Sequence, residues 1–149
     1  MLIISLAPAS MKSQFRGRER DMTNKIRQEV TFATSSQRVY ETLTDAKQFS
    51  AFSGESAEID AKAGGAFSCF GGMITGRNVE LKPGQRIVQA WRAGNWPEGV
   101  YSIVKFELEA KGASSQLTLE HTGFPEDMAP HLEGGWKNKY LGPLKKYLD

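Results

Sequence analysis

The sequence is poor in the residues from which metal sites and many catalytic sites are built. It contains one cysteine, Cys69, and two histidines, His121 and His131, among 149 residues. One cysteine excludes an intramolecular disulfide framework and suits a reducing compartment, which predicts a cytoplasmic protein. Three such residues cannot build a Cys/His zinc cage. The sequence also lacks a P-loop, a dinucleotide-binding fingerprint, a nucleophile elbow and a His-x-x-x-His pair, so we expect no metal and no cofactor.

An excess of charge of one sign is also missing from most of the chain. The formal net charge is +2, and residues 1–22 account for it with four basic residues against Glu19 and Asp21. The remaining chain has 15 basic and 15 acidic residues, so it has no basic footprint for nucleic acid. No apolar stretch approaches the length of a membrane span. We therefore expect neither nucleic acid nor a membrane as a partner, and either a monomer or a homodimer.

The chain divides at about residue 22. Residues 1–22 are predicted to be a disordered tail or an over-extended start, and residues 23–149 a single domain. The opening MLIISLAPAS has an apolar run followed by Ala-Pro-Ala, which faintly resembles a signal peptide, but it lacks a positive n-region. Met22 offers a later start directly before the first periodic segment.

From residue 25 onward the pattern predicts one strand, two short helices, six strands and a long helix. The expected strands are 25–32, 57–61, 66–70, 74–81, 86–92, 100–109 and 115–122. The expected helices are 34–43, 45–52 and 131–149. Alternating apolar residues mark the strands, Thr34 to Gln37 has the spacing of a capping box, and glycine-rich turns separate the strands. This order is typical of an α+β protein with an antiparallel meander.

Two strands show which side of the sheet is buried. In QLTLEHT the residues Leu117, Leu119 and His121 share one face, so His121 points the same way as the core leucines. Alternation places three carboxylates on the outer faces of these strands, where solvation accounts for them: Glu107, Glu109 and Glu120. Cys69 alternates with Phe67 and is predicted to pack as a small hydrophobic residue.

The last segment, HLEGGWKNKYLGPLKKYLD, combines a helical pattern with residues that disfavour helices. Apolar residues recur at a strict spacing of four: Leu132, Trp136, Tyr140, Leu144 and Leu148. Such a row drifts by about 40° per step around an α-helix. We therefore expect a bend at Gly142–Pro143 that re-aims the second half toward a curved sheet. Gly134 and Gly135 are expected to allow a close backbone approach beside Trp136.

Several segments resemble one family. The stretches TLTDAKQFSAFSG, EIDAKAGGAFSCFGGMITGRNVELKPGQRIVQAWR, WPEGVYSIVKFEL and LEHTGFP…HLEGGW look like the homologues of the activator of heat-shock protein 90 ATPase, in their bacterial single-domain type. The shared pattern covers residues 25–149. The resemblance implies the START-like helix-grip fold of the SRPBCC superfamily, with a curved antiparallel sheet of about seven strands, two short helices after strand one and a long C-terminal helix.

Aromatic residues are plentiful, which leaves two interpretations open. They form a packed core, or they line a cavity between the sheet and the C-terminal helix, as START-like relatives commonly have. Small-molecule sites are mostly apolar with a few polar groups. The candidate ligand-binding residues are Phe67, Trp91, Tyr101, His121, Trp136 and Tyr140, and the candidate polar groups are Arg77, Arg92, Tyr101 and His121. His121 itself is either a satisfied structural histidine or a polar hook for a ligand.

Three functions remain open at this level. We expect a non-enzymatic domain that binds a hydrophobic or amphipathic small molecule in the cavity, with no catalytic residue. The family resemblance implies, as an alternative, a co-chaperone-like protein of the stress response that contacts a chaperone and stimulates heat-shock protein 90 ATPase. The polyketide cyclases of the superfamily imply a third function, an enzyme, which would need an acid or base in the cavity beyond His121.

Overall fold

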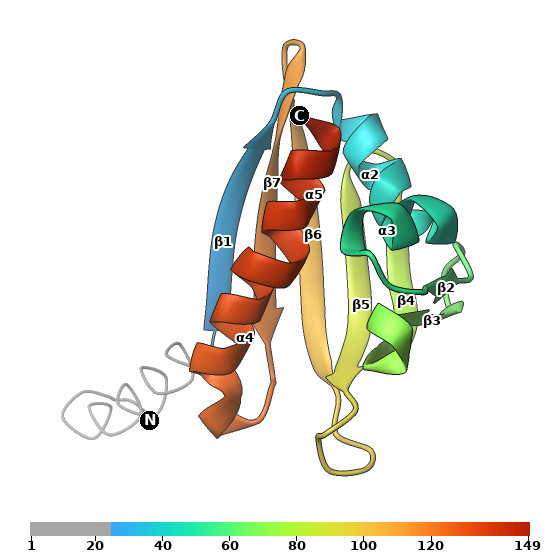
Figure 1. Cartoon of the computed structure of the whole chain (residues 1–149), viewed down its shortest axis with the longest axis vertical. Coiled ribbons are helices and arrows are strands. Elements are labelled where there is room, and N and C mark those ends of the chain that lie inside the picture. The colour runs from blue at the N-terminus through green and yellow to red at the C-terminus, as the bar shows by residue number, and fades with distance from the viewer. Residues whose placement is uncertain (1–24) are drawn as a thin grey trace, which may run out of the picture.

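The computed structural model describes residues 25–149, so the tail predicted at residues 1–22 lies outside the described residues. The described chain forms one seven-stranded antiparallel sheet, and its helices lie against one face of this sheet (Figure 1). The strand order is β1-β7-β6-β5-β4-β3-β2, a meander from β2 to β7 that β1 extends by pairing with β7. The predicted α+β helix-grip architecture is confirmed.

The bounds of the elements differ from the sequence prediction mainly at their ends. The strands are β1 (Lys25–Phe32), β2 (Glu58–Ile59), β3 (Ala66–Cys69), β4 (Ile74–Lys82), β5 (Arg86–Ala93), β6 (Ser102–Lys111) and β7 (Ser114–Thr122). The helices are α2 (Ser36–Thr44), α3 (Ala46–Ser53), η1 (Phe70–Gly72), η2 (Glu126–Met128), α4 (Ala129–Gly135), η3 (Trp136–Leu141) and α5 (Gly142–Leu148). The strand expected at 57–61 shrinks to two residues, and the strand expected at 100–109 begins two residues later.

A side-chain cap begins each of the short helices α2 and α3. Ser35, and not the predicted Thr34, caps α2, because its hydroxyl accepts a hydrogen bond from the Arg38 N–H at 3.1 Å. Asp45 ends α2 and starts α3, since its carboxylate accepts from the Gln48 N–H at 3.0 Å. The sharp turn between the helices seats α3 against α5, over one end of the sheet.

Alternation along the strands builds the core. Eight side chains of β6 and β7 are buried on one face: Ser102, Val104, Phe106, Leu108, Ser115, Leu117, Leu119 and His121. The predicted common face of Leu117, Leu119 and His121 is therefore confirmed. Cys69 is also buried and packs in the same core, as predicted.

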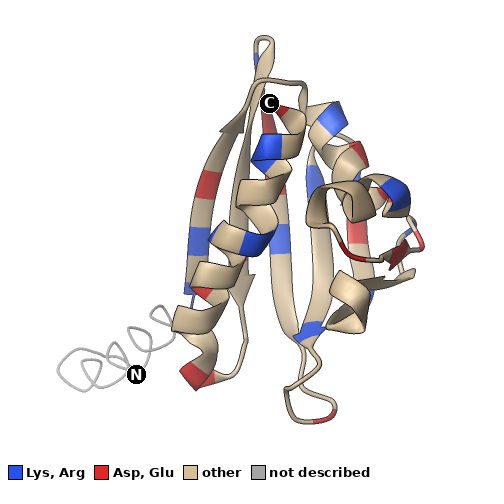
Figure 2. Ribbon diagram, viewed as in Figure 1, with Lys and Arg blue, Asp and Glu red and all other residues tan. Residues whose placement is uncertain are grey.

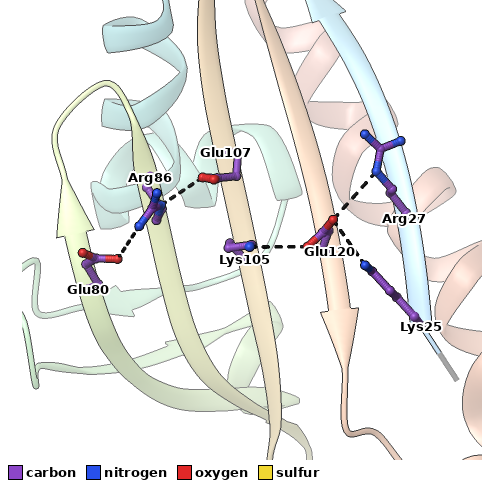
Figure 3. Close-up of polar contacts among 7 residues, drawn as sticks. All are labelled: Lys25, Arg27, Glu80, Arg86, Lys105, Glu107 and Glu120. Carbon is purple, nitrogen blue, oxygen red and sulfur yellow. Dashed lines mark hydrogen bonds and ion pairs between the residues drawn. The ribbon is translucent and has the colours of Figure 1, made fainter. Parts of the chain in front are cut away.

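The other face of the sheet carries ion pairs (Figure 3). One group joins Arg86 to Glu80 and Glu107, and a second joins Glu120 to Lys25, Arg27 and Lys105. Partial burial raises the pKa of the Glu120 carboxyl, but the charges of Lys25 and Lys105 outweigh this effect and hold the pKa below its ordinary value. Charges of both signs alternate over the described chain (Figure 2). On the sheet face, the basic and acidic side chains of these groups lie next to each other.

The long C-terminal segment grips the core through its four-residue row. Four of the five residues are buried and the last packs against the core: Leu132, Trp136, Tyr140, Leu144 and Leu148. The row stays on one face because η3 is a π-helix, which takes more residues per turn than an α-helix and so offsets the drift of a four-residue spacing. A wide turn thus lies directly before Pro143, where the sequence predicts a bend.

Two glycine predictions need correction on this helix. A Cβ at Gly135 would have no heavy atom within 4 Å, and one at Gly134 would only reach Asn138 Nδ2 at 4.0 Å. The expected close backbone approach at these positions is therefore wrong. The crowded glycine is Gly142, where a Cβ would lie 2.6 Å from the Lys137 carbonyl oxygen. The Gly142 N–H bonds to this same oxygen, so the wide turn itself creates the crowding.

Candidate functional site

The described residues enclose a cleft of about 360 Å³ between the C-terminal helix and one end of the sheet. Its walls come from α4 and η3 on one side, and from η1, the end of β5 and the loop after β5 on the other. The lining residues are Glu55, Phe70, Met73, Ile74, Trp91, Ala93, Asn95, Trp96, Met128, His131, Leu132, Gly135, Trp136, Lys139 and Tyr140. Six of the lining residues are buried: Trp91, Ala93, Trp96, Leu132, Trp136 and Tyr140. Phe70, Ile74, Met128 and Gly135 are partly buried, and the exposed rim consists of Glu55, Met73, Asn95, His131 and Lys139.

The helical periodicity of the C-terminal segment forms one wall. Leu132, Gly135, Trp136, Lys139 and Tyr140 follow one another at steps of three and one, so they share a face of the helix. Gly135 has no side chain, and since a Cβ there would meet nothing, it leaves space in this wall.

The opposite wall depends on a turn with unusual backbone angles. Phe70 has φ = 55°, and Gly71 and Gly72 follow with φ of 65° and 95°. A phenylalanine in this region is uncommon and costs on the order of 1–2 kcal/mol. Its ring packs against Phe49 and Tyr140, with centroids 5.6 and 5.4 Å away. This packing holds the turn in place over the cleft.

Behind the cleft, His121 connects the helix to the sheet. The Trp136 indole N–H donates to His121 Nδ1 at 2.9 Å, because an indole nitrogen can only donate. His121 therefore carries its proton on Nε2, which donates to the Ser102 hydroxyl at 2.7 Å. That hydroxyl donates in turn to the Trp91 carbonyl at 2.9 Å. The chain of hydrogen bonds fixes Trp136 and the backbone of Trp91, which both line the cleft.

The protonation of the buried groups follows from their surroundings. His121 has no exposed surface, and burial lowers its pKa to about 3, so the imidazole is neutral near pH 7. Burial raises the pKa of the Cys69 thiol to about 12, which removes its nucleophilic form. Burial, with a smaller effect of Cys69, also raises the pKa of the Tyr140 phenol well above its usual value. The inner cleft is thus electrically neutral.

The structure brings three of the six predicted ligand-binding residues into the cleft: Trp91, Trp136 and Tyr140. His121 lies behind it, bonded at both nitrogens. Phe67 is buried and Tyr101 is half exposed, and both line a separate hollow that also includes Arg77.

The predicted cationic polar groups lie elsewhere. Arg77 donates to the Gly64 carbonyl at 2.9 Å. Arg92 donates to the carbonyls of Trp96 and Pro97, and its guanidinium lies 5.8 Å from the centre of the Tyr101 ring. The expectation that Arg77, Arg92 and Tyr101 point into the cavity under the helix is therefore wrong. Strand alternation explains this, because Arg77 and Arg92 lie on the sheet face opposite to Trp91.

Several cleft residues escaped the sequence analysis. The lining residues that were not predicted as ligand-binding are Glu55, Phe70, Met73, Ile74, Ala93, Asn95, Trp96, Met128, His131, Leu132, Gly135 and Lys139. A signal existed for two of them: Lys139 lies three residues after Trp136, and Ala93 two residues after Trp91, positions that share a face with those tryptophans. Glu55 and Met73 join the cleft only through folding of the chain around η1, which no local pattern predicts.

The described residues contain no group of three or more His, Cys, Asp or Glu side chains that could hold a metal ion. No helix in the same part of the chain is long and apolar enough to cross a membrane. A curved antiparallel sheet that grips a long C-terminal helix, with an apolar cleft between them, defines the START-like class of domains.

Comparison with known families identifies the branch of this class. The model of the family described as Activator of Hsp90 ATPase homolog 1-like protein matches residues 33–149. The chain therefore belongs to this family, and the resemblance seen in the sequence is confirmed.

Two curated relatives carry the activator name. The chain is 34% identical over 124 residues to the activator of 90 kDa heat shock protein ATPase homolog of Dictyostelium discoideum, covering 83% of this chain and 32% of that protein. It is 29% identical over 118 residues to homolog 2 of this activator in Mus musculus, covering 79% of this chain and 36% of that protein. The chain thus spans about a third of the length of these relatives.

Three solved structures share the fold. An HSP90 activator from Plasmodium falciparum has a TM-score of 0.79 at 27% identity, covering 83% of this chain and 95% of that one. The Aha1 dimer from Colwellia psychrerythraea has a TM-score of 0.71 at 22% identity, and the match covers 83% of this chain and 95% of that one. A protein of the dynemicin biosynthetic locus has a TM-score of 0.70 at 21% identity, and the match covers 84% of this chain and 47% of that one. The last two show the fold alone.

Proposed function

We propose that this domain binds an apolar or amphipathic small molecule in the cleft between its C-terminal helix and the end of its sheet, without transforming it. One observation carries the proposal: a cleft of about 360 Å³ has buried aromatic walls and an exposed polar rim. Its volume lies in the range of about 300–1,000 Å³ that small-molecule sites occupy. The single buried cysteine is compatible with a reducing compartment such as the cytoplasm.

The chemistry of the inner wall favours binding over catalysis. A general acid or base must reach the reacting group and change its charge near the working pH. His121 is separated from the cleft by Trp136 and stays neutral, and the phenol of Tyr140 also stays neutral. The titratable side chains that line the cleft at its rim are Glu55, His131 and Lys139, in contact with solvent. A cyclase-like enzyme would have to work with these rim groups.

The test fills the cleft from its glycine. Gly135→Leu places a side chain in the wall, whereas Gly134→Leu places the same side chain on the same helix at a position that does not line the cleft. We expect the neutral dye Nile red to bind the original protein with a saturable rise in fluorescence. Gly135→Leu should weaken this binding about tenfold or more, and Gly134→Leu should leave it unchanged. Equal binding by both variants would place the dye outside the cleft and contradict the proposal.

Contact with a chaperone is the second candidate function. It is favoured by family membership and by the Dictyostelium relative, whose name describes an activator of heat shock protein ATPase. The match covers only about a third of that relative, so the activity of the whole relative is a proposal for this chain. A homodimer is likewise a proposal, which the dimer of the Colwellia protein supports only through the shared fold.

A further inference from the structure

Three hydrogen-bonding groups line the cleft without a partner. Trp91, Trp96 and Tyr140 are each at least nine-tenths buried, with exposed fractions of 4%, 5% and 6%. The hydrogen bonds among residues 25–149 include none to the two indole N–H groups or to the phenol hydroxyl. By contrast, the third tryptophan of the cleft, Trp136, donates to His121. The chain has three tryptophans in all, so one is bonded and two are free within the described residues.

The free groups have access to the cleft. Among the described residues, one fully buried side-chain nitrogen or oxygen atom lacks a hydrogen-bond partner, and this atom is Gln89 Oε1. The N–H groups of Trp91 and Trp96 and the hydroxyl of Tyr140 are therefore not fully enclosed by protein. The cleft is the opening that all three side chains line. A ligand that fills the cleft without pairing with these groups would enclose them unpaired, at a cost of about 1–3 kcal/mol for each, so a ligand that pairs with them is favoured.

The three groups differ in what they can accept. An indole nitrogen only donates, and a phenol donates or accepts. Two of the three groups thus require an acceptor oxygen or nitrogen on the ligand. The charged rim does not bias this choice, because Lys139 and Glu55 carry opposite charges at the same cleft. The inner wall therefore decides whether the polar group of the ligand must donate or accept hydrogen bonds.

We infer that the ligand of this cleft is an apolar carbonyl compound, a ketone or a carboxylic acid, whose acceptor oxygen pairs with donors among the indole N–H groups of Trp91 and Trp96 and the hydroxyl of Tyr140. This inference rests on the proposed binding function and adds the chemical class of the ligand. The hydrocarbon part lies against Phe70, Ile74 and Leu132, the apolar lining of the same cleft. A ligand whose polar group only donates, such as an ammonium, leaves the indole N–H groups unpaired and is disfavoured.

The experiment uses three probes with the same eight-carbon length: octanoate, 2-octanone and octylammonium. Aliphatic probes produce no ring-current shifts, so the indole N–H resonances of the isotope-labelled protein report hydrogen bonding directly. We expect octanoate and 2-octanone to move the Trp91 and Trp96 resonances downfield at saturation and to leave Trp136, already bonded to His121, nearly unchanged. Octylammonium should bind at least tenfold more weakly than the other two.

Two variants remove the donors and keep an aromatic ring at each position. Trp96→Phe and Tyr140→Phe should each weaken binding of octanoate and 2-octanone several-fold more than they weaken binding of octylammonium. Both should fold, because the N–H and O–H that they remove have no partner among residues 25–149. The indole shifts of the original protein provide a readout that does not depend on the variants.

The outcomes separate this inference from the proposed function. Equal affinity for all three probes, or saturation without movement of the Trp91 and Trp96 resonances, would overturn the carbonyl specificity and leave the cleft as an apolar binding site. Failure of all three probes and of Nile red to bind would overturn the binding function, and the carbonyl specificity with it.

Discussion

At the scale of single residues, His121 decides how the cleft is built. It has no exposed surface, and it links Trp136 on the helix to Ser102 on the sheet through its two ring nitrogens. A charged imidazole would lose the bond from the indole N–H, because both nitrogens would then be donors. His121 is therefore a positioning residue for the helix, and its neutral form is part of the folded structure.

This role predicts a pH dependence of stability. The folded pKa of His121, about 3, lies below its ordinary value of 6.5. Below pH 6.5 the unfolded chain takes up a proton that the native state does not, so stability is complete above pH 6.5 and falls as the pH drops toward 3. The free energy of unfolding should be lower at pH 5 than at pH 8 by about 2 kcal/mol from this group. Urea denaturation at several pH values measures the slope.

Variants separate His121 from other titrating groups. His121→Gln should flatten the slope between pH 5 and pH 6.5, whereas His131→Gln, at an exposed position, should leave it unchanged. The lowered pKa values of Glu120 and Asp149 start from ordinary values of 4.5 and 3.8, so most of their effect appears below this window. An unchanged slope in His121→Gln would show that this histidine is not held neutral.

At the scale of elements, the C-terminal helix is shaped by its π-helical segment. In a regular α-helix the ring of Pro143 would collide with the carbonyl four residues earlier. The wide turn of η3 directly before Pro143 avoids this collision and keeps the four-residue row against the core. It also brings the Lys137 carbonyl to 2.6 Å from where a Cβ of Gly142 would lie.

Two glycines of this helix should respond to alanine with opposite signs. Gly134→Ala should raise the free energy of unfolding by about 0.5–1 kcal/mol, because alanine favours the helix and its Cβ meets only an ordinary contact. Gly142→Ala should lower it by about 1–3 kcal/mol, because the Cβ would collide with a backbone carbonyl that cannot move freely. Chemical denaturation of both variants measures the two signs. Stabilisation by Gly142→Ala would mean that the π turn is absent.

At the scale of the whole molecule, the sheet has two faces with different tasks. One face holds the helix and the cleft, and the other presents ion pairs of both signs to solvent (Figure 3). Association with a large charged partner is accelerated by a region of one sign, whereas on this face basic and acidic side chains pair with each other. This face thus offers little electrostatic steering toward a chaperone.

We therefore expect this 149-residue chain to stimulate the ATPase of a bacterial heat-shock protein 90 little or not at all. The physical reason is that basic and acidic side chains pair with each other on the sheet face, which leaves little charge of one sign to steer a large partner. Steady-state ATP hydrolysis at increasing concentrations of the chain measures the effect, with a full-length eukaryotic activator and its own chaperone as the positive control. Strong, saturable stimulation combined with no uptake of Nile red would reverse the order of the two candidate functions.

The sequence by itself determined the parts of the fold that depend on local periodicity. Alternation in QLTLEHT placed His121 on the core face, and the spacing from Leu132 to Leu148 predicted the gripping helix. It also predicted Trp91, Trp136 and Tyr140, which the structure places in the cleft.

Only the tertiary structure decided the geometry between elements. The hydrogen bond from Trp136 to His121 joins residues on η3 and β7, and the rim residue Glu55 reaches the cleft through the turn at η1. The sequence alone assigned Arg77 and Arg92 to the cavity, and the structure places them on the opposite face of the sheet. The π turn likewise forms where two constraints meet: the four-residue row must stay packed against the core, and Pro143 cannot donate a backbone hydrogen bond. Local propensity fixes which face of an element is apolar, whereas the contacts that make a site depend on how distant elements pack.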